Sequence, residues 1–137
     1  MKANRLTRET IRDLGKQTKA LTPFTIGDAI AISQWITEGT KKRLQVFEGD
    51  VIAVHNNGAS STFTVRKIGA NNIAVERIYP FHSPVIDTIK VISSGDVCRA
   101  KLYYMRDRIG KHARVKEKVL TREQKELAKK KLAQEQA

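Results

Sequence analysis

The chain has 137 residues, with 26 lysines and arginines against 14 aspartates and glutamates, which gives a formal net charge of +12. This length fits one domain with extensions, and its core is large enough to need no disulfide or structural metal. One cysteine excludes an internal disulfide and no run of about 18 apolar residues is present, so we expect a soluble protein of a reducing compartment with no membrane partner.

The first predicted element is a helix over residues 4–20. Three arginines form a ridge along it at i, i+3 and i+7: Arg5, Arg8 and Arg12. Pro23 ends the helix because the residue before a proline disfavours the α conformation. Residues 1–22 are therefore predicted to form a basic helical extension, either a docked helix with a solvated face or a helix that contacts RNA.

From Phe24 the apolar pattern changes from helical to alternating. It predicts strands over residues 29–37, 43–55, 62–68, 73–79, 85–92 and 97–104. Five or six short strands joined by short turns are typical of a small closed or half-closed β-barrel. Gly49 interrupts a strong strand and indicates a bulge or a barrel corner. We expect one barrel with a basic arm over residues 23–114.

The segment over residues 96–114 begins as the last predicted strand and ends as a basic arm. Strict alternation places Leu102 and Tyr104 on an apolar face and Arg99 and Lys101 on the opposite face. After Met105 the alternation stops and four cations follow: Arg106, Arg108, Lys111 and Arg114. The segment is therefore predicted to connect the β core to a polyanion. Its two tyrosines are candidates either for stacking on unpaired bases or for half-buried core positions.

Residues 115–137 form the second helical candidate. Thr121 and Gln124 have capping-box spacing, but the apolar stripe that follows is too thin for strong tertiary packing. We predict a charged C-terminal extension that orders, if at all, on a partner.

The charge is sorted along the chain. Residues 1–22 carry six basic and two acidic side chains, residues 23–94 seven and six, residues 95–118 eight and three, and residues 119–137 five and three. A nearly neutral middle with basic flanks indicates a folded core that places cationic segments against a polyanion.

Five stretches in order are similar to one known family. They are QVFEG at residues 45–49, TFTVRKI at 62–68, VERIYPFHSP at 75–84, ID at 86–87 and RAKLYYMRDRIGK at 99–111. Together they resemble the nineteenth protein of the bacterial large ribosomal subunit, over about residues 24–114. The chain departs from that family in two loops, where residues 55–59 and 93–96 carry fewer basic side chains, and Cys98 stands where a basic residue is common.

The resemblance implies an SH3-like β-barrel bound to large-subunit ribosomal RNA. It also implies a position beside the fourteenth large-subunit protein and near the third. Contact with small-subunit ribosomal RNA across the interface, through an intersubunit bridge, comes from the resemblance as well. We expect a cytoplasmic ribosome, and an organellar ribosome stays open.

The expected chemistry is ionic, because lysine and arginine neutralise phosphates and release counterions. The predicted ribosomal RNA contacts are Lys41, Lys42, Arg43, Arg66, Lys67, Arg77, Arg99, Lys101, Arg106, Arg108, Lys111 and Arg114. For each of them, the alternative is an ordinary solvated surface cation.

An enzyme is the less favoured class. His82 and Ser83 are adjacent in sequence, which does not orient one toward the other, and no phosphate-binding loop or paired-carboxylate motif is present. The three histidines and Cys98 lack metal-ligand spacing, and we expect no cofactor and no small-molecule substrate. We predict a structural ribosomal RNA-binding protein. The alternatives are a free translation or transcription factor with the same barrel, or a hydrolase centred on His82 and Ser83.

Overall fold

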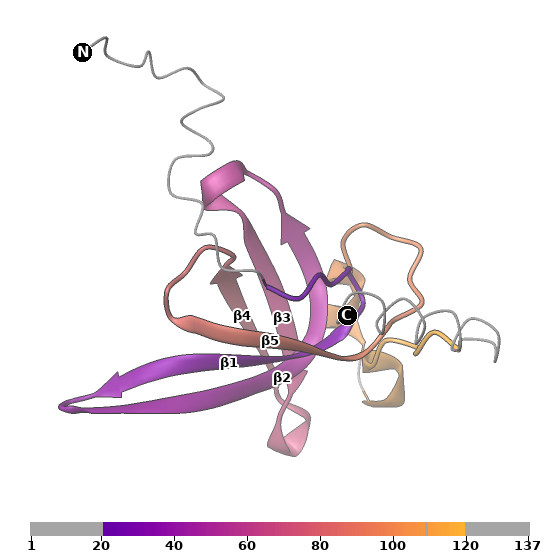
Figure 1. Ribbon diagram of the computed structural model, residues 1–137. Coiled ribbons are helices and arrows are strands. Elements are labelled where there is room, and N and C mark those ends of the chain that lie inside the picture. Colours follow the sequence, from indigo (N-terminus) through magenta and orange to yellow (C-terminus); the bar gives the residue numbers. More distant parts are fainter. Residues whose placement is uncertain (1–20, 109, 120–137) are drawn as a thin grey trace, which may run out of the picture.

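The computed structural model describes residues 21–108 and 110–119 (Figure 1). Its strands are β1 (Ala29–Glu38), β2 (Lys41–His55), β3 (Thr62–Ile68), β4 (Ala74–Pro80) and β5 (Ile86–Ser93). Four 3-10 helices complete the described part: η1 (Gly58–Ser60), η2 (Ala70–Asn72), η3 (Tyr103–Asp107) and η4 (Gly110–Ala113). The all-β core is confirmed, whereas the predicted helix over residues 4–20 lies outside the described residues. Among the helices described, none has the length and apolar character needed to cross a membrane.

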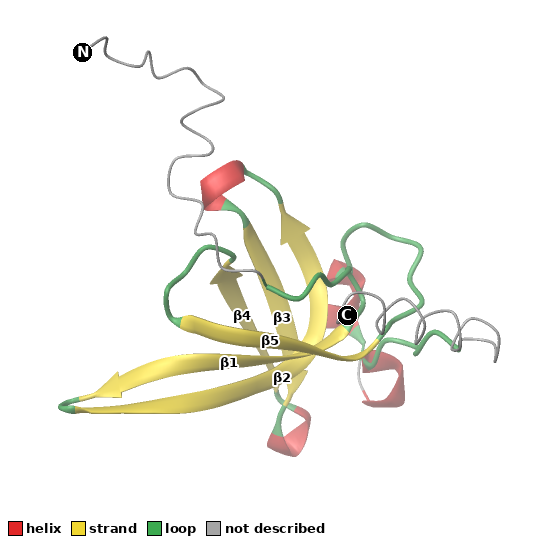
Figure 2. Ribbon diagram, in the orientation of Figure 1, coloured by secondary structure: helices red, strands yellow, loops and turns green. Residues whose placement is uncertain are grey.

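The strands form one antiparallel sheet in the order β4-β3-β2-β1-β5 (Figure 2). The long strand β2 holds it together because it pairs with β1 up to Asp50 and with β3 from Asp50 onward. Gly49 lies where the partner changes, and a Cβ there would overlap the backbone carbonyl of Arg66. The sequence therefore marks this corner correctly, while the register shift itself falls between Val51 and Ala53.

The main core lies on one face of the curled sheet. Every strand contributes to it, and β1 and β3 do so at alternate positions, as strand geometry requires. The buried residues are Ile30, Ile32, Phe47, Val51, Phe63, Val65, Tyr79, Ile86 and Ile89. Phe63 is central, with ring centroids 5.0 Å from Phe24, 4.8 Å from Phe81 and 5.6 Å from Tyr79. Aromatic contacts thus attach the segments before β1 and after β4 to the sheet.

The predicted strand over residues 97–104 is wrong. Only one isolated bridge forms, between Ala53 and Lys101, and Cys98 is exposed although alternation places it with buried Leu102. The reason is that the buried side chains of this segment repeat every three residues instead of every two. Leu102 and Met105 both enter a second core cluster, which a 3-10 turn permits and a strand does not. The arm, defined here as residues 96–114, is therefore a docked, mostly irregular segment.

Residues 115–118 also differ from the prediction of a helix over 115–137. They run extended beside residues 94–96, where Asp96 N–H donates to Lys116 O at 2.8 Å and Lys118 N–H donates to Ser94 O at 2.7 Å. A glycine is required at position 95 in this contact, because a Cβ there would overlap the carbonyl of Gly27 and come within 2.8 Å of a Val115 methyl group. The residues that follow the arm are thus fixed to the segment after β5, and residues 120–137 lie outside the described part.

Candidate nucleic-acid interface

The arm is held on the sheet by a small core of its own. Leu102 is fully buried and Met105 is 2% exposed, and both pack against Ile52 and Ala53 of β2. The backbone N–H of Leu102 donates to the carbonyl of Ile52 at 2.8 Å. Burial of these two side chains contributes roughly 1.5 to 3 kcal/mol each, so the arm has a defined position on the sheet.

Three arginines of the arm stack on two neighbouring tyrosines. The guanidinium carbons of Arg99 and Arg108 lie 5.4 Å and 4.5 Å from the ring centre of Tyr104. That of Arg106 lies 4.7 Å from the ring centre of Tyr103. Stacking restrains a guanidinium through its face and leaves its N–H edge available to donate, which is the geometry that grips a phosphate. Arg106 uses part of that edge, because its Nε and Nη2 donate to the carboxylate of Glu76. The arm thus presents a cluster of oriented donors.

Glu76 on β4 connects the sheet to the arm. Its Oε1 accepts from Nη1 of Arg66 at 2.8 Å, and its Oε2 accepts from Nη2 of Arg106 at 2.8 Å, with Nε of Arg106 close to both oxygens. The hydrogen bond from Arg106 is the main reason that the pKa of Glu76 is lowered, although burial opposes the shift. The Arg66 side chain is only 10% exposed and that of Arg106 is 50% exposed. Arg66 therefore braces the arm, while Arg106 keeps a surface toward solvent.

The remaining predicted contacts near the arm occupy distinct places. Lys67 and Arg77 lie over the ring of Phe47, at 5.9 Å and 4.7 Å from its centre. Lys101 is exposed beside its bridge to β2. Lys111 belongs to η4, and its side chain lies outside the described part of the structure.

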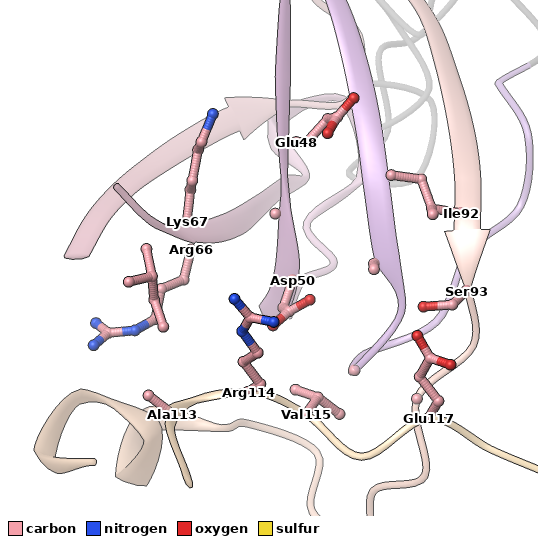
Figure 3. Close-up of a pocket in the computed structure, with 15 residues that line it drawn as sticks. Glu48, Asp50, Arg66, Lys67, Ile92, Ser93, Ala113, Arg114, Val115 and Glu117 are labelled. Carbon is pink, nitrogen blue, oxygen red and sulfur yellow. The ribbon is translucent and has the colours of Figure 1, made fainter. Parts of the chain in front are cut away.

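A cleft of about 340 Å³ lies between the sheet and the end of the arm (Figure 3). Arg114 points toward Asp50 there, and Glu48, Glu117 and Lys67 also line the cleft. Burial raises the pKa of Asp50, while a hydrogen bond from the Val115 backbone and the charge of Arg114 act in the opposite direction. With three carboxylates in its wall, the cleft is a poor phosphate site. Arg114 thus faces a carboxylate of the cleft, and it also lines a second, smaller pocket together with Tyr104 and Arg108.

The predicted basic hairpin tip forms at the end of β1 and β2, far from the arm (Figure 1). Lys41, Lys42 and Arg43 are all exposed there. Arg43 donates to Glu38 through Nη2 at 2.6 Å and Nε at 3.0 Å, so its charge is partly offset. The cations that the sequence groups together therefore occupy two separate ends of the molecule.

The enzymatic alternative finds no assembled site. Ser83 Oγ accepts from the backbone N–H of Val85 at 3.3 Å, and His82 lines a small apolar pocket with Phe24 and Phe81. Within residues 21–108 and 110–119, no hydrogen bond joins His82 to Ser83, and no group of three metal-ligating side chains gathers. Nothing in this turn activates a nucleophile.

Sequence reasoning missed two features of the interface. It did not single out Glu76, and it did not pair the tyrosines with the arginines that stack on them. The available signal was cross-strand spacing, because residues 66 and 76 pair directly in the β3–β4 hairpin. The position of Arg106 over this pair depends on the 3-10 turn, which alternation concealed.

Comparison with known proteins agrees with the sequence resemblance. A model of the family described as Ribosomal protein L19 matches residues 7–118. The chain is also similar to the large ribosomal subunit protein bL19 of Clostridium botulinum strains Hall, Okra and Kyoto. Each is 52% identical over 99 residues, which cover 72% of this chain and 86% of the relative. The chain therefore belongs to the ribosomal protein L19 family, and it is a structural protein rather than an enzyme.

Proposed function

We propose that this chain binds large-subunit ribosomal RNA through the cations of its docked arm. As a member of its family it is a structural constituent of the large ribosomal subunit. The observation that carries the proposal is the cluster of Arg99, Arg106 and Arg108, stacked on two tyrosines of a segment that is packed onto the barrel. Rigidly held arginines suit a protein that reads folded RNA by shape and phosphate pattern.

We further propose that the sheet is an SH3-like barrel, with residues 23–114 as the RNA-binding unit between extensions 1–22 and 115–137. Support comes from the bend of β2 and from backbone bonds that fold the chain back on itself. Gly27 N–H donates to Val51 O at 2.8 Å, and Val51 N–H donates to Asp28 O at 2.9 Å. We propose each lysine and arginine of the predicted contact set as a contact to ribosomal RNA. Arg66 contributes mainly by holding Glu76, which in turn holds Arg106 of the arm.

The finer assembly is proposed from the family resemblance. The partners are the fourteenth and third large-subunit proteins and small-subunit ribosomal RNA across an intersubunit bridge, in a cytoplasmic ribosome. The separation of the hairpin tip from the arm supports this arrangement, because a chain with two cationic ends can contact two different neighbours (Figure 1).

Competition binding tests the proposed function. The full chain is bound to labelled large-subunit RNA and challenged with excess unlabelled RNA from either subunit. Large-subunit RNA is expected to displace the label at a lower concentration than small-subunit RNA, because dispersed cations on a fixed scaffold match one folded surface. Equal displacement by both RNAs would reduce the interaction to nonspecific charge attraction.

A further inference from the structure

The outer face of the β1–β2 hairpin carries a row of large apolar side chains that are about half exposed. Trp35 is 42% exposed, Leu44 is 45% exposed and Val46 is 53% exposed. Large side chains of this kind are rarely grouped on a free surface without a binding role.

Strand register places these residues together. Trp35 lies directly opposite Leu44, and Val46 lies opposite Ser33, one step closer to the barrel. Because side chains alternate along a strand, all four share one face of the hairpin. The opposite face is engaged instead, since Gln34 Nε2 donates to Gln45 Oε1 at 3.1 Å and Ile32 is fully buried.

The outer part of the hairpin is a two-stranded ribbon. The pairing of β5 with β1 ends at Gln34 and is followed by one more backbone bond, in which Trp35 N–H donates to Val85 O at 2.9 Å, while β3 pairs with β2 only from Asp50. Within the described chain, the strand residues beyond Trp35 and Leu44 therefore pair only with each other. Two-stranded ribbons have marginal stability on their own in water. A surface that covers the Trp35 face would therefore stabilise the ribbon as well as bind it.

The two ends of the apolar row carry opposite charges. Lys42 shares the face of Trp35, because it lies opposite Thr37 at the tip end. Glu48 shares the same face at the barrel end, opposite Ala31. A ligand that places a flat apolar group on the indole is therefore drawn to place its negative charge toward the tip. That combination of a planar face and an adjacent anion describes a nucleotide.

We propose that Trp35 stacks on an unpaired base of large-subunit ribosomal RNA, with the adjoining phosphate on Lys42 and with Leu44 and Val46 beside the base. Single-stranded bases are commonly bound by aromatic stacking with a nearby cation. The inference rests on the proposed function and adds a second RNA contact at the end of the molecule opposite the arm.

Trp35 is the only tryptophan in the chain, so its fluorescence reports on this face alone. The full-length chain is titrated with large-subunit RNA while indole emission and RNA binding are both followed. Stacking on a base quenches indole emission, so we expect quenching that saturates together with binding. Substitution Lys42→Ala is expected to shift the quenching curve to higher RNA concentration.

Two variants at the same position separate stacking from simple apolar packing. Trp35→Phe keeps an aromatic face and is expected to retain most of the affinity. Trp35→Leu keeps apolar area but loses the ring, and is expected to weaken binding about 5- to 150-fold, the usual range for loss of one stacked base. Thermal unfolding of both variants checks that the hairpin still forms.

The outcomes distinguish failure of the base-stacking inference from failure of the proposed RNA-binding function. RNA binding without quenching, or full affinity in Trp35→Leu, would overturn the base-stacking inference and leave the proposed function standing. An indole emission that instead rises and shifts to shorter wavelength on assembled subunits would assign this face to a protein neighbour and would also overturn it. A complete lack of RNA binding by the wild-type chain would remove both.

Discussion

Replacing Arg99, Arg106 and Arg108 together with alanine is expected to weaken binding to large-subunit RNA and to flatten its salt dependence by about 2 to 3 units of double-logarithmic slope. The magnitude follows from roughly 0.7 to 0.9 units for each lost phosphate contact. These arginines are chosen because all three stack on the arm tyrosines and are exposed. Filter binding across a series of salt concentrations gives the slope.

A charge-matched variant separates position from net charge. Lys90, Lys116 and Lys118 are exposed and lie outside the predicted contact set, so replacing them with alanine removes the same three charges elsewhere. We expect this control to change the slope by less than one unit. An arm variant that behaves like the control would exclude the arm from the interface.

Substitution Leu102→Ala is expected to lower the free energy of unfolding by about 2 to 5 kcal/mol, the usual range for a fully buried leucine. The loss arises because the side chain anchors the arm against Ile52, Ala53 and Met105, and the cavity left behind has no other residue to fill it. Urea unfolding monitored by circular dichroism measures the change. Ile78→Ala is the control, because Ile78 is 69% exposed on β4 and its loss is expected to cost less than about 0.5 kcal/mol.

The same variant also tests how the arm binds RNA. Leu102→Ala leaves every cation in place but loosens the segment that orients them, so we expect weaker binding with a nearly unchanged salt slope. This pattern differs from that of the triple arginine variant, which changes both quantities. A Leu102→Ala chain that binds RNA with wild-type affinity would show that docking of the arm is unnecessary for recognition.

The sheet was most predictable in β1 and β3, because these strands bury alternate residues on one face. The pattern from Thr62 to Ile68 is clear: Phe63 and Val65 are buried and Arg66 faces the other side. Strand ends moved by only one or two residues, as at β1 and β2. Gly49 was predicted to mark a bulge or a barrel corner because it interrupts a strong strand. The structure adds the reason for a glycine, since a Cβ there would overlap the backbone of Arg66.

The arm was harder to predict because its sequence satisfies two periods. Residues 97–104 alternate like a strand, yet Leu102 and Met105 also satisfy the three-residue period that the packing selects. That choice depends on space offered by Ile52 and Ala53, which are distant in sequence. Likewise, the number of lysines and arginines in residues 96–114 was enough to predict a basic arm. Only the tertiary structure shows that Glu76 forms ion pairs with Arg66 and Arg106.

The most direct test of the central claim is sedimentation of the full-length tagged chain, expressed in its own cells, through a sucrose gradient after a moderately high-salt wash. We predict that the chain migrates with large subunits and whole ribosomes. A chain that stays at the top of the gradient would be a free RNA-binding factor, which would contradict a structural role in the large subunit.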